Sequence, residues 1–316
     1  MCLGIACLLA AGAAGLAFGQ NVPTVESRRD VAVGRGIVPA MQPATSATAL
    51  RGGVSNAATA AGAGGAEFGE QRIAYRRAHI EPWTAVVDLQ VFRTDNAALT
   101  STGKQSDCYM RYGAAVNYAN RVVGPLFVDL AVQQSAFRYA EFDVLDFDLT
   151  RVEAGLLLQT LGRFDAFLFA RYRFEYITEA GLGSQLFANH SLEVGLQKVW
   201  KITRGQRFFA GVAALVPLET DPGGAGRGEY SATVGYTLRL TEQINAGVSY
   251  RGAWYHYSKG GREDWNHLLN IGASYDVADW LQLGLNFTYT LNRSNAARAD
   301  YESLVPGGSL AVRLAF

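Results

Sequence analysis

The chain has 316 residues, with 28 basic and 28 acidic side chains and therefore a formal net charge of zero. Without an excess of basic residues there is no electrostatic field that would attract nucleic acid, so we exclude nucleic acid as a partner. Hydrophobic residues make up 49% of the chain. After the first 25 residues, however, no apolar run approaches the roughly 18 residues that a membrane-spanning helix needs, which excludes a helical membrane protein.

Residues 1–19 predict a secretory signal peptide. No charged residue precedes Glu26, residues 8–18 form an apolar run, and Ala17 and Gly19 are small enough for cleavage after Gly19. The positive charge that usually opens such a signal is missing. We nevertheless expect the protein to be exported.

Residues 20–82 predict a flexible segment in the periplasm. Their composition is rich in Ala, Gly, Thr and Ser. So few large apolar side chains cannot offset the entropy lost on ordering the chain. The alternative is an arm that docks elsewhere, for which the arginines Arg28, Arg29, Arg76 and Arg77 are the main support. An unstructured segment is the preferred interpretation.

From Trp83 to Phe316 apolar side chains alternate with polar or small ones, the period of two that is typical of half-buried strands. The eleventh repeat of this pattern shows it clearly, because Leu281, Leu283 and Leu285 alternate with polar or small residues. The pattern predicts twelve strands at residues 83–93, 107–118, 125–136, 148–160, 164–176, 190–200, 207–218, 229–240, 244–257, 265–276, 280–292 and 307–316.

The predicted connections alternate between short and long. Short turns lie near 118–124, 161–163, 201–206, 241–243 and 276–279, and long polar loops lie near 94–106, 137–147, 177–189, 219–228, 258–264 and 293–306. This asymmetry is typical of a transmembrane barrel with short periplasmic turns and long outer loops. The strands also suit a bilayer, which a tilted strand of about 9 to 11 residues crosses. A soluble secreted β-sandwich is the remaining alternative.

Aromatic residues gather at the predicted strand ends, where an amphipathic ring would meet lipid headgroups. The periplasmic girdle is expected to contain Trp83, Phe164, Trp200, Phe208, Trp280 and Phe316, and the outer one Tyr176, Tyr230, Trp254, Trp265 and Tyr289. Outer-membrane lipids are therefore an expected partner.

The last segment, GGSLAVRLAF, places Leu310, Val312, Leu314 and Phe316 on one face of a strand. It resembles the carboxy-terminal strand of the bacterial outer-membrane β-barrel (porin-like) superfamily, and the resemblance covers residues 83–316. It implies an all-β fold: a closed antiparallel up-and-down transmembrane β-barrel of about twelve strands. It also implies an outer-membrane location in a Gram-negative-type envelope and recognition by the barrel-assembly machinery through the last strand.

Charged residues fall on the set of positions that faces the lumen of such a barrel. We expect these to line the pore: Arg111, Asp129, Arg151, Glu153, Arg171, Arg173, Glu175, Glu193, Arg239 and Arg251. Two functions stay open. Either the barrel is a porin-like passive channel for small solutes, or the charges pair into networks that fill a structural barrel. No long insertion predicts a plug, although the loop 94–106 is placed to fold inward. Neither a cofactor nor a metal is implied.

A second possibility, an enzyme, rests on one segment, WYHYSKGGREDWNHLLN. It contains His256, Ser258, Gly260, Trp265 and Asn266, and it resembles the H-x-S-N-G sequence and following W-N pair of outer-membrane phospholipase A. The resemblance implies a calcium-assisted lipid hydrolase in which Ser258 is the nucleophile, His256 the general base and Asn266 the residue that orients the imidazole. Lys259 replaces the asparagine of that family, and Asn266 falls on the inward-facing set of its strand. We therefore prefer a non-enzymatic barrel.

Overall fold

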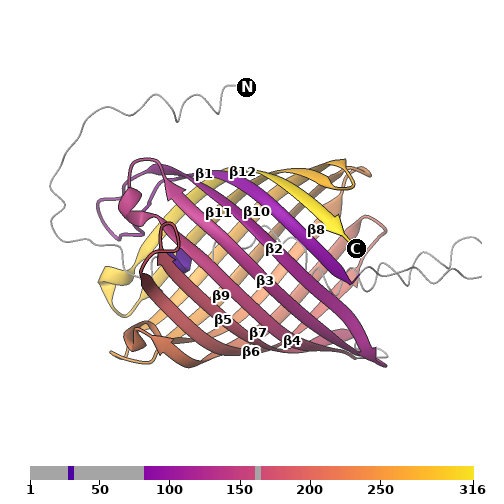
Figure 1. Ribbon diagram of the computed structural model, residues 1–316, viewed down its shortest axis with the longest axis horizontal. Coiled ribbons are helices and arrows are strands. Elements are labelled where there is room, and N and C mark those ends of the chain that lie inside the picture. The colour runs from indigo at the N-terminus through magenta and orange to yellow at the C-terminus, as the bar shows by residue number, and fades with distance from the viewer. Residues whose placement is uncertain (1–27, 32–81, 161–164) are drawn as a thin grey trace, which may run out of the picture.

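Twelve antiparallel strands form a closed barrel (Figure 1). The computed structural model describes residues 28–31, 82–160 and 165–316. The strands are β1 (Trp83–Thr94), β2 (Asp107–Val123), β3 (Leu126–Tyr139), β4 (Phe147–Gln159), β5 (Ala166–Glu179), β6 (Gln185–Lys201), β7 (Gln206–Asp221), β8 (Arg227–Arg239), β9 (Ile244–Tyr257), β10 (Glu263–Ala278), β11 (Leu281–Ser294) and β12 (Tyr301–Ala315). In the described part of the chain, three short 3-10 helices lie in the loops: η2 (Asp143–Leu145), η3 (Gly223–Ala225) and η4 (Ala297–Ala299).

Each strand pairs with its sequence neighbours, and β1 closes the barrel against β12. At the closure, the Trp83 N–H donates to the Phe316 carbonyl at 3.1 Å and the Phe316 N–H donates to the Trp83 carbonyl at 3.0 Å. Closure leaves no strand edge unpaired, which is the condition for a sheet to lie in hydrocarbon. The predicted fold class and the predicted number of strands are confirmed.

At the end of the barrel that carries the longer loops, the strands extend further than the sequence predicts. β9 has the predicted bounds, whereas β6 begins at Gln185 instead of residue 190 and β12 begins at Tyr301 instead of residue 307. The extra residues include buried polar side chains such as Asn189 and Ser303. Their partners lie inside the barrel, so they break the apolar alternation without ending the strand. The expected long loops at 177–189 and 293–306 are accordingly too long.

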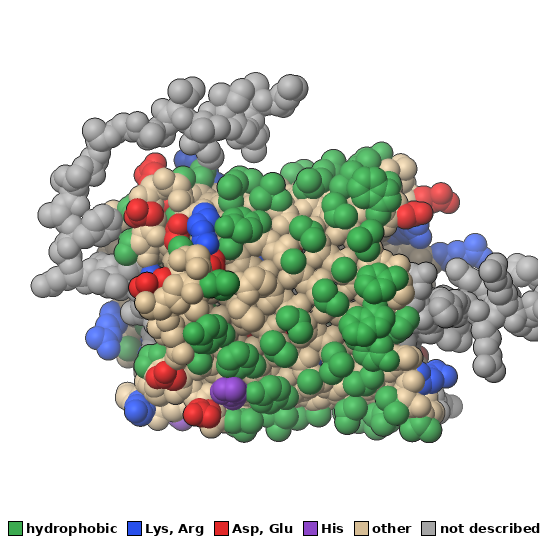
Figure 2. Space-filling model, in the orientation of Figure 1, with side chains coloured by type: hydrophobic (Ala, Val, Ile, Leu, Met, Phe, Trp, Pro, Cys, Tyr) green, Lys and Arg blue, Asp and Glu red, His purple; other side chains and the backbone are tan. Residues whose placement is uncertain are grey.

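Apolar side chains cover the outside of the barrel wall. Those at least about one-third exposed include Val87, Val132, Leu156, Leu192, Val212, Val234, Tyr250, Ile271 and Leu285. Figure 2 shows apolar side chains over the wall between the two ends, and acidic and basic side chains at those ends. Since a soluble protein does not leave such a belt in water, the wall faces lipid. No helix among the described residues is long and apolar enough to cross a membrane.

We expect Val234→Arg to destabilise the barrel by about 2 to 4 kcal/mol, because its side chain projects from the middle of β8 into the bilayer. Leu240→Arg is the matched control, since Leu240 lies one residue beyond the end of β8 and the penalty near the interface is about 0 to 1 kcal/mol. Urea unfolding in lipid vesicles measures both. Equal losses would contradict the assignment of this face to lipid.

The described members of the predicted periplasmic girdle lie at one end of the barrel and point outward. Trp83, Trp200, Phe208, Trp280 and Phe316 are all more than one-third exposed. Three of them pair with rings on a neighbouring strand. The ring centroids of Trp83 and Tyr118 are 4.7 Å apart, and those of Trp200 and Phe208 are 5.3 Å apart. The sixth, Phe164, lies outside the described residues, as does the predicted signal peptide.

Candidate functional site

The lumen is lined by charged side chains at its centre. They come from alternate positions of the strands, because the pleat sends every second side chain inward. Arg171 and Arg173 of β5, for example, point inward while Leu168 and Tyr172 point to lipid. The inward set is dominated by arginine and carboxylate side chains that are close enough to form ion pairs.

One ion-pair network, in the middle of the lumen, is centred on Arg171 and Arg173. Arg171 binds Asp129 at 3.0 Å and approaches Glu153 and Glu193 at 3.7 and 3.6 Å. Arg173 binds the same two glutamates, Glu153 at 2.8 Å and Glu193 at 2.7 Å. Strands β3, β4, β5 and β6 thus contribute to one network of two guanidinium groups and three carboxylates.

A second network lies closer to the end with the longer loops. Arg151 binds Glu175 at 2.7 Å. Glu229 accepts hydrogen bonds from Arg227 and from Arg251, each at 3.1 Å. Arg227 has no exposed surface and its guanidinium lies 3.9 Å from the centre of the Tyr255 ring. Each of these charges is compensated, as buried charges must be.

The two remaining predicted arginines differ from each other. Arg111 is buried, pairs with Asp88 and donates to the Ser135 hydroxyl at 2.9 Å. Arg239 is exposed at the end of β8, where it donates to the carbonyls of Thr241 and Glu242 in the adjacent turn. The structure therefore places Arg111 in the lumen and Arg239 at the rim, outside both networks.

A helical turn formed by residues 28–31 lies inside the barrel, near the end with the longer loops (Figure 1, in indigo). Arg29 lies 3.7 Å from Glu175 and 3.4 Å from Glu229. Asp30 accepts hydrogen bonds from Arg227 at 2.7 Å and from the Tyr301 hydroxyl at 2.9 Å. Both charged side chains of this turn therefore have partners on the wall of the lumen.

The contacts of this turn are spread around the barrel. Glu175 belongs to β5, Arg227 to β8 and Tyr301 to β12, which are separated by three, four and five steps around the ring of twelve strands. A single helical turn that touches all three strands must occupy the middle of the lumen. It is an inserted plug, which the sequence did not predict.

A hydrophobic core surrounds the turn at the same end of the barrel. It combines inward-facing rings of the strands with loop side chains, and Val31 is part of it. The ring centroids of Phe137 and Phe147 are 4.3 Å apart. Ala97 and Leu99 are buried in this core, so the loop 94–106 does fold inward, as the sequence allowed. The outer mouth is thus packed by residues 28–31 together with the first loop.

The residues proposed for lipid hydrolysis do not form a triad. His256 is exposed on the outside of β9, 3.5 Å from Glu263, and Ser258 is exposed in the following turn. Asn266 is buried in the lumen, where it donates to Asn292 at 3.2 Å and Tyr301 at 3.4 Å. The barrel wall therefore separates Asn266 from the imidazole it would orient.

Sequence reasoning missed four residues of the site: Asp30, Arg227, Glu229 and Tyr301. Arg227 and Tyr301 fell in predicted loops, and Asp30 fell in the predicted flexible segment. A signal was present for two of them. Arg227 and Glu229 continue the alternation of Ser231 on the inward face of β8, which extending the pattern by two residues would have shown.

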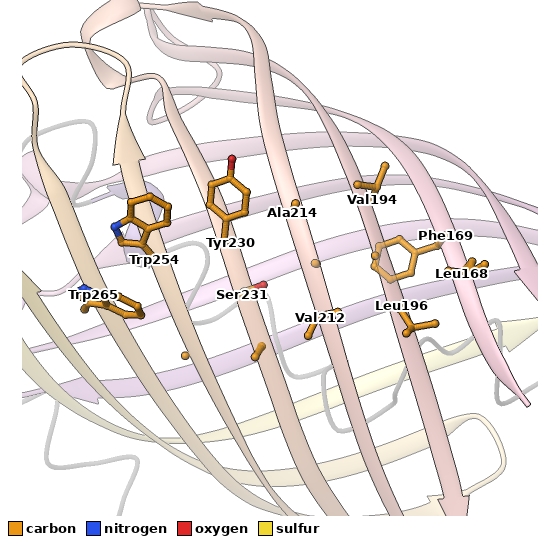
Figure 3. Close-up of a pocket in the computed structure, with 14 residues that line it drawn as sticks. Leu168, Phe169, Val194, Leu196, Val212, Ala214, Tyr230, Ser231, Trp254 and Trp265 are labelled. Atoms are coloured by element: carbon orange, nitrogen blue, oxygen red, sulfur yellow. The ribbon is translucent and has the colours of Figure 1, made fainter. Parts of the chain in front are cut away.

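A shallow hollow lies on the lipid side of the wall, across β5 to β10 (Figure 3). It has a volume of about 740 Å³ and is bordered by Val194, Val212, Tyr230, Trp254 and Trp265. Its apolar lining suits acyl chains rather than a polar solute. Among the described residues, no cluster of three or more His, Cys, Asp or Glu side chains is arranged to hold a metal ion.

A closed antiparallel barrel with an apolar outer belt, aromatic strand ends and a charged lumen defines a transmembrane β-barrel of the outer-membrane type. No protein-family model matches the sequence, and no curated protein matches it.

Solved structures do resemble the chain. An outer-membrane channel from Pseudomonas putida F1 superposes with a TM-score of 0.54 at 10% identity, over 74% of this chain and 96% of that one. The KdgM porin (TM-score 0.40, 8% identity, 73% and 99% covered) and the DcaP channel of Acinetobacter baumannii (0.40, 10%, 73% and 96%) are more distant. The first likeness supports the fold assignment.

Proposed function

We propose that the protein is a passive outer-membrane channel for small solutes, occluded in this conformation by its own residues 28–31. The observation that supports it is the composition of the lumen at its centre. Six wall arginines (Arg111, Arg151, Arg171, Arg173, Arg227 and Arg251) face six wall carboxylates (Asp88, Asp129, Glu153, Glu175, Glu193 and Glu229). Apolar side chains would fill a purely structural barrel without the desolvation of twelve charges. Charged groups of both signs suit a water-filled path for polar solutes.

Ion selectivity tests this function. Because the wall charges balance, the native channel is expected to discriminate weakly between cations and anions. Arg171→Gln and Arg173→Gln together remove two positive charges and leave Asp129, Glu153 and Glu193 in place, so reversal potentials in planar bilayers should shift toward cation selectivity. Arg239→Gln at the rim is the matched control and should shift them less.

The alternative of a structural barrel makes a different prediction. If the networks seal the lumen permanently, the wild type and variants of residues 28–31 should all leave planar bilayers sealed. Conductance steps in any of these proteins favour the channel.

Lipid hydrolysis is a weaker candidate, because Asn266 and His256 lie on opposite faces of the wall. We expect Ser258→Ala to leave phospholipid hydrolysis at the background level of the wild type, measured in mixed micelles with calcium. A wild-type activity that disappears in Ser258→Ala would instead establish the enzyme.

We also propose that outer-membrane lipids and the barrel-assembly machinery are the partners of the outer wall and of β12. The exposed apolar side chains of Leu310, Leu314 and Phe316, at the end of the closing strand, support this assignment. The location in the outer membrane follows from the same fold and the same apolar belt. A periplasmic position for the rest of residues 20–82 stays a prediction.

A further inference from the structure

Arg29 and Asp30 lie against two groups of oppositely charged side chains on the wall of the lumen, which we call the anionic and the cationic pocket. Asp30 is hydrogen-bonded there, whereas Arg29 lies within ion-pair distance, and its Nε and Nη1 have no hydrogen-bond partner among the described residues. The first consists of the carboxylates of Glu175 and Glu229, with the Phe187 ring 5.2 Å from the Arg29 guanidinium. The second consists of the Arg227 guanidinium and the Tyr301 hydroxyl, which hold the two carboxylate oxygens of Asp30. The wall therefore offers an anionic pocket beside a cationic one.

The cationic pocket has an unused donor. Arg227 donates to Asp30 through Nη1, whereas its Nη2 is buried and has no hydrogen-bond partner among the described residues. A guanidinium group binds a carboxylate most strongly when both terminal nitrogens take part. Asp30, tethered to the neighbouring residues of the chain, uses only one of them. A free ligand that is not tethered can use both.

The pockets would be left incompletely satisfied if residues 28–31 withdrew. Glu175 would keep Arg151, and Glu229 would keep Arg227 and Arg251, but Arg227 would lose its closest carboxylate oxygen. Buried charged groups without partners are unfavourable, so an open lumen favours any solute that restores the lost contacts.

We propose that these pockets form a solute-binding site for short peptides that carry a guanidinium group next to a carboxylate, and that Arg29 and Asp30 occupy it as an internal mimic of the solute. The proposal deepens the channel function and rests on it for its physiological role. Binding itself does not depend on conduction. The segment and the solute compete, because both need Glu175, Glu229, Arg227 and Tyr301.

Calorimetry on the full-length protein in detergent tests the proposal. The probe is N-acetyl-Arg-Asp-amide, and the two controls are the same dipeptide with Asn in place of Asp and with Gln in place of Arg. The protein carries Arg29→Ala and Asp30→Ala to empty the pockets. We expect the Arg-Asp probe to bind this variant at least tenfold more tightly than either control, and tenfold more tightly than it binds the wild type, in which the segment competes.

Two wall variants in the same background locate the site. Tyr301→Phe removes one hydroxyl, and Arg227→Lys keeps the charge but removes the paired nitrogens. Each variant should therefore lower the affinity for the Arg-Asp probe several-fold. Neither should change the weak binding of the Asn control, which lacks the carboxylate. Absence of binding, or equal binding of the probe and its controls, would overturn the proposed site.

The failure of this proposal is distinguishable from failure of the channel. If the probe binds to a protein that never conducts, the proposed channel function is wrong and the proposed binding site is supported. If the protein conducts but does not bind the probe selectively, the channel function is supported and the proposed binding site is wrong.

Discussion

Replacing Arg29 and Asp30 together by alanine is expected to raise the time-averaged conductance per channel several-fold over that of the wild type. The two substitutions remove the ion pairs to Glu175, Glu229 and Arg227 that hold the helical turn in the middle of the lumen. Without them the turn keeps mainly the packing of Val31 and the Arg28 hydrogen bond to the Val144 carbonyl. The open state should therefore be populated more often. Planar-bilayer recordings of the full-length proteins measure the effect.

A pair outside the lumen provides the control. Arg293 and Asp300 lie 3.9 Å apart in the outer loop region, and their double alanine variant removes the same two kinds of side chain without touching the lumen. Its conductance should equal that of the wild type. If the Arg29 and Asp30 variant also conducts like the wild type, residues 28–31 do not limit the flow.

Arg227→Ala is expected to destabilise the barrel by about 3 to 5 kcal/mol, because it leaves Asp30 and Glu229 in a buried site with less positive charge. The guanidinium also contacts the Tyr255 ring and donates to the Tyr257 hydroxyl at 3.1 Å, so further contacts are lost. Urea unfolding in vesicles, followed by tryptophan fluorescence, gives the change in the free energy of unfolding.

Arg239→Ala is the matched control on the same strand. Its side chain is exposed and donates only to turn carbonyls, so its loss should change the free energy of unfolding by about 0.5 kcal/mol or less. Similar losses for the two arginines would show that the burial of Arg227 has no energetic consequence. That result would also argue against a fixed position for Asp30.

The lipid-facing side chains of the outer wall could be predicted from the sequence, because the pattern that identifies them involves only neighbouring residues. A strand that separates lipid from a polar lumen must alternate side chains with a period of two, and Leu281, Leu283 and Leu285 show this without any tertiary information. The same alternation marks Arg171, Arg173 and Glu175 as inward-facing. The predicted strands stop short of the outer strand ends, where Asn189 and Arg227 are buried polar residues in regions that look like loops.

The sequence alone determined the number of strands, the lipid-facing side chains and most of the charges on the lumen wall. Only the tertiary structure decided which charges pair and what occupies the space between them. Those pairings join residues far apart in the chain, such as Asp30 and Tyr301, which are separated by 271 positions. The closure of β1 on β12 and the register of every strand must be set before such groups meet. For that reason the pairing of residues 28–31 with the lumen wall could not be predicted from the local sequence.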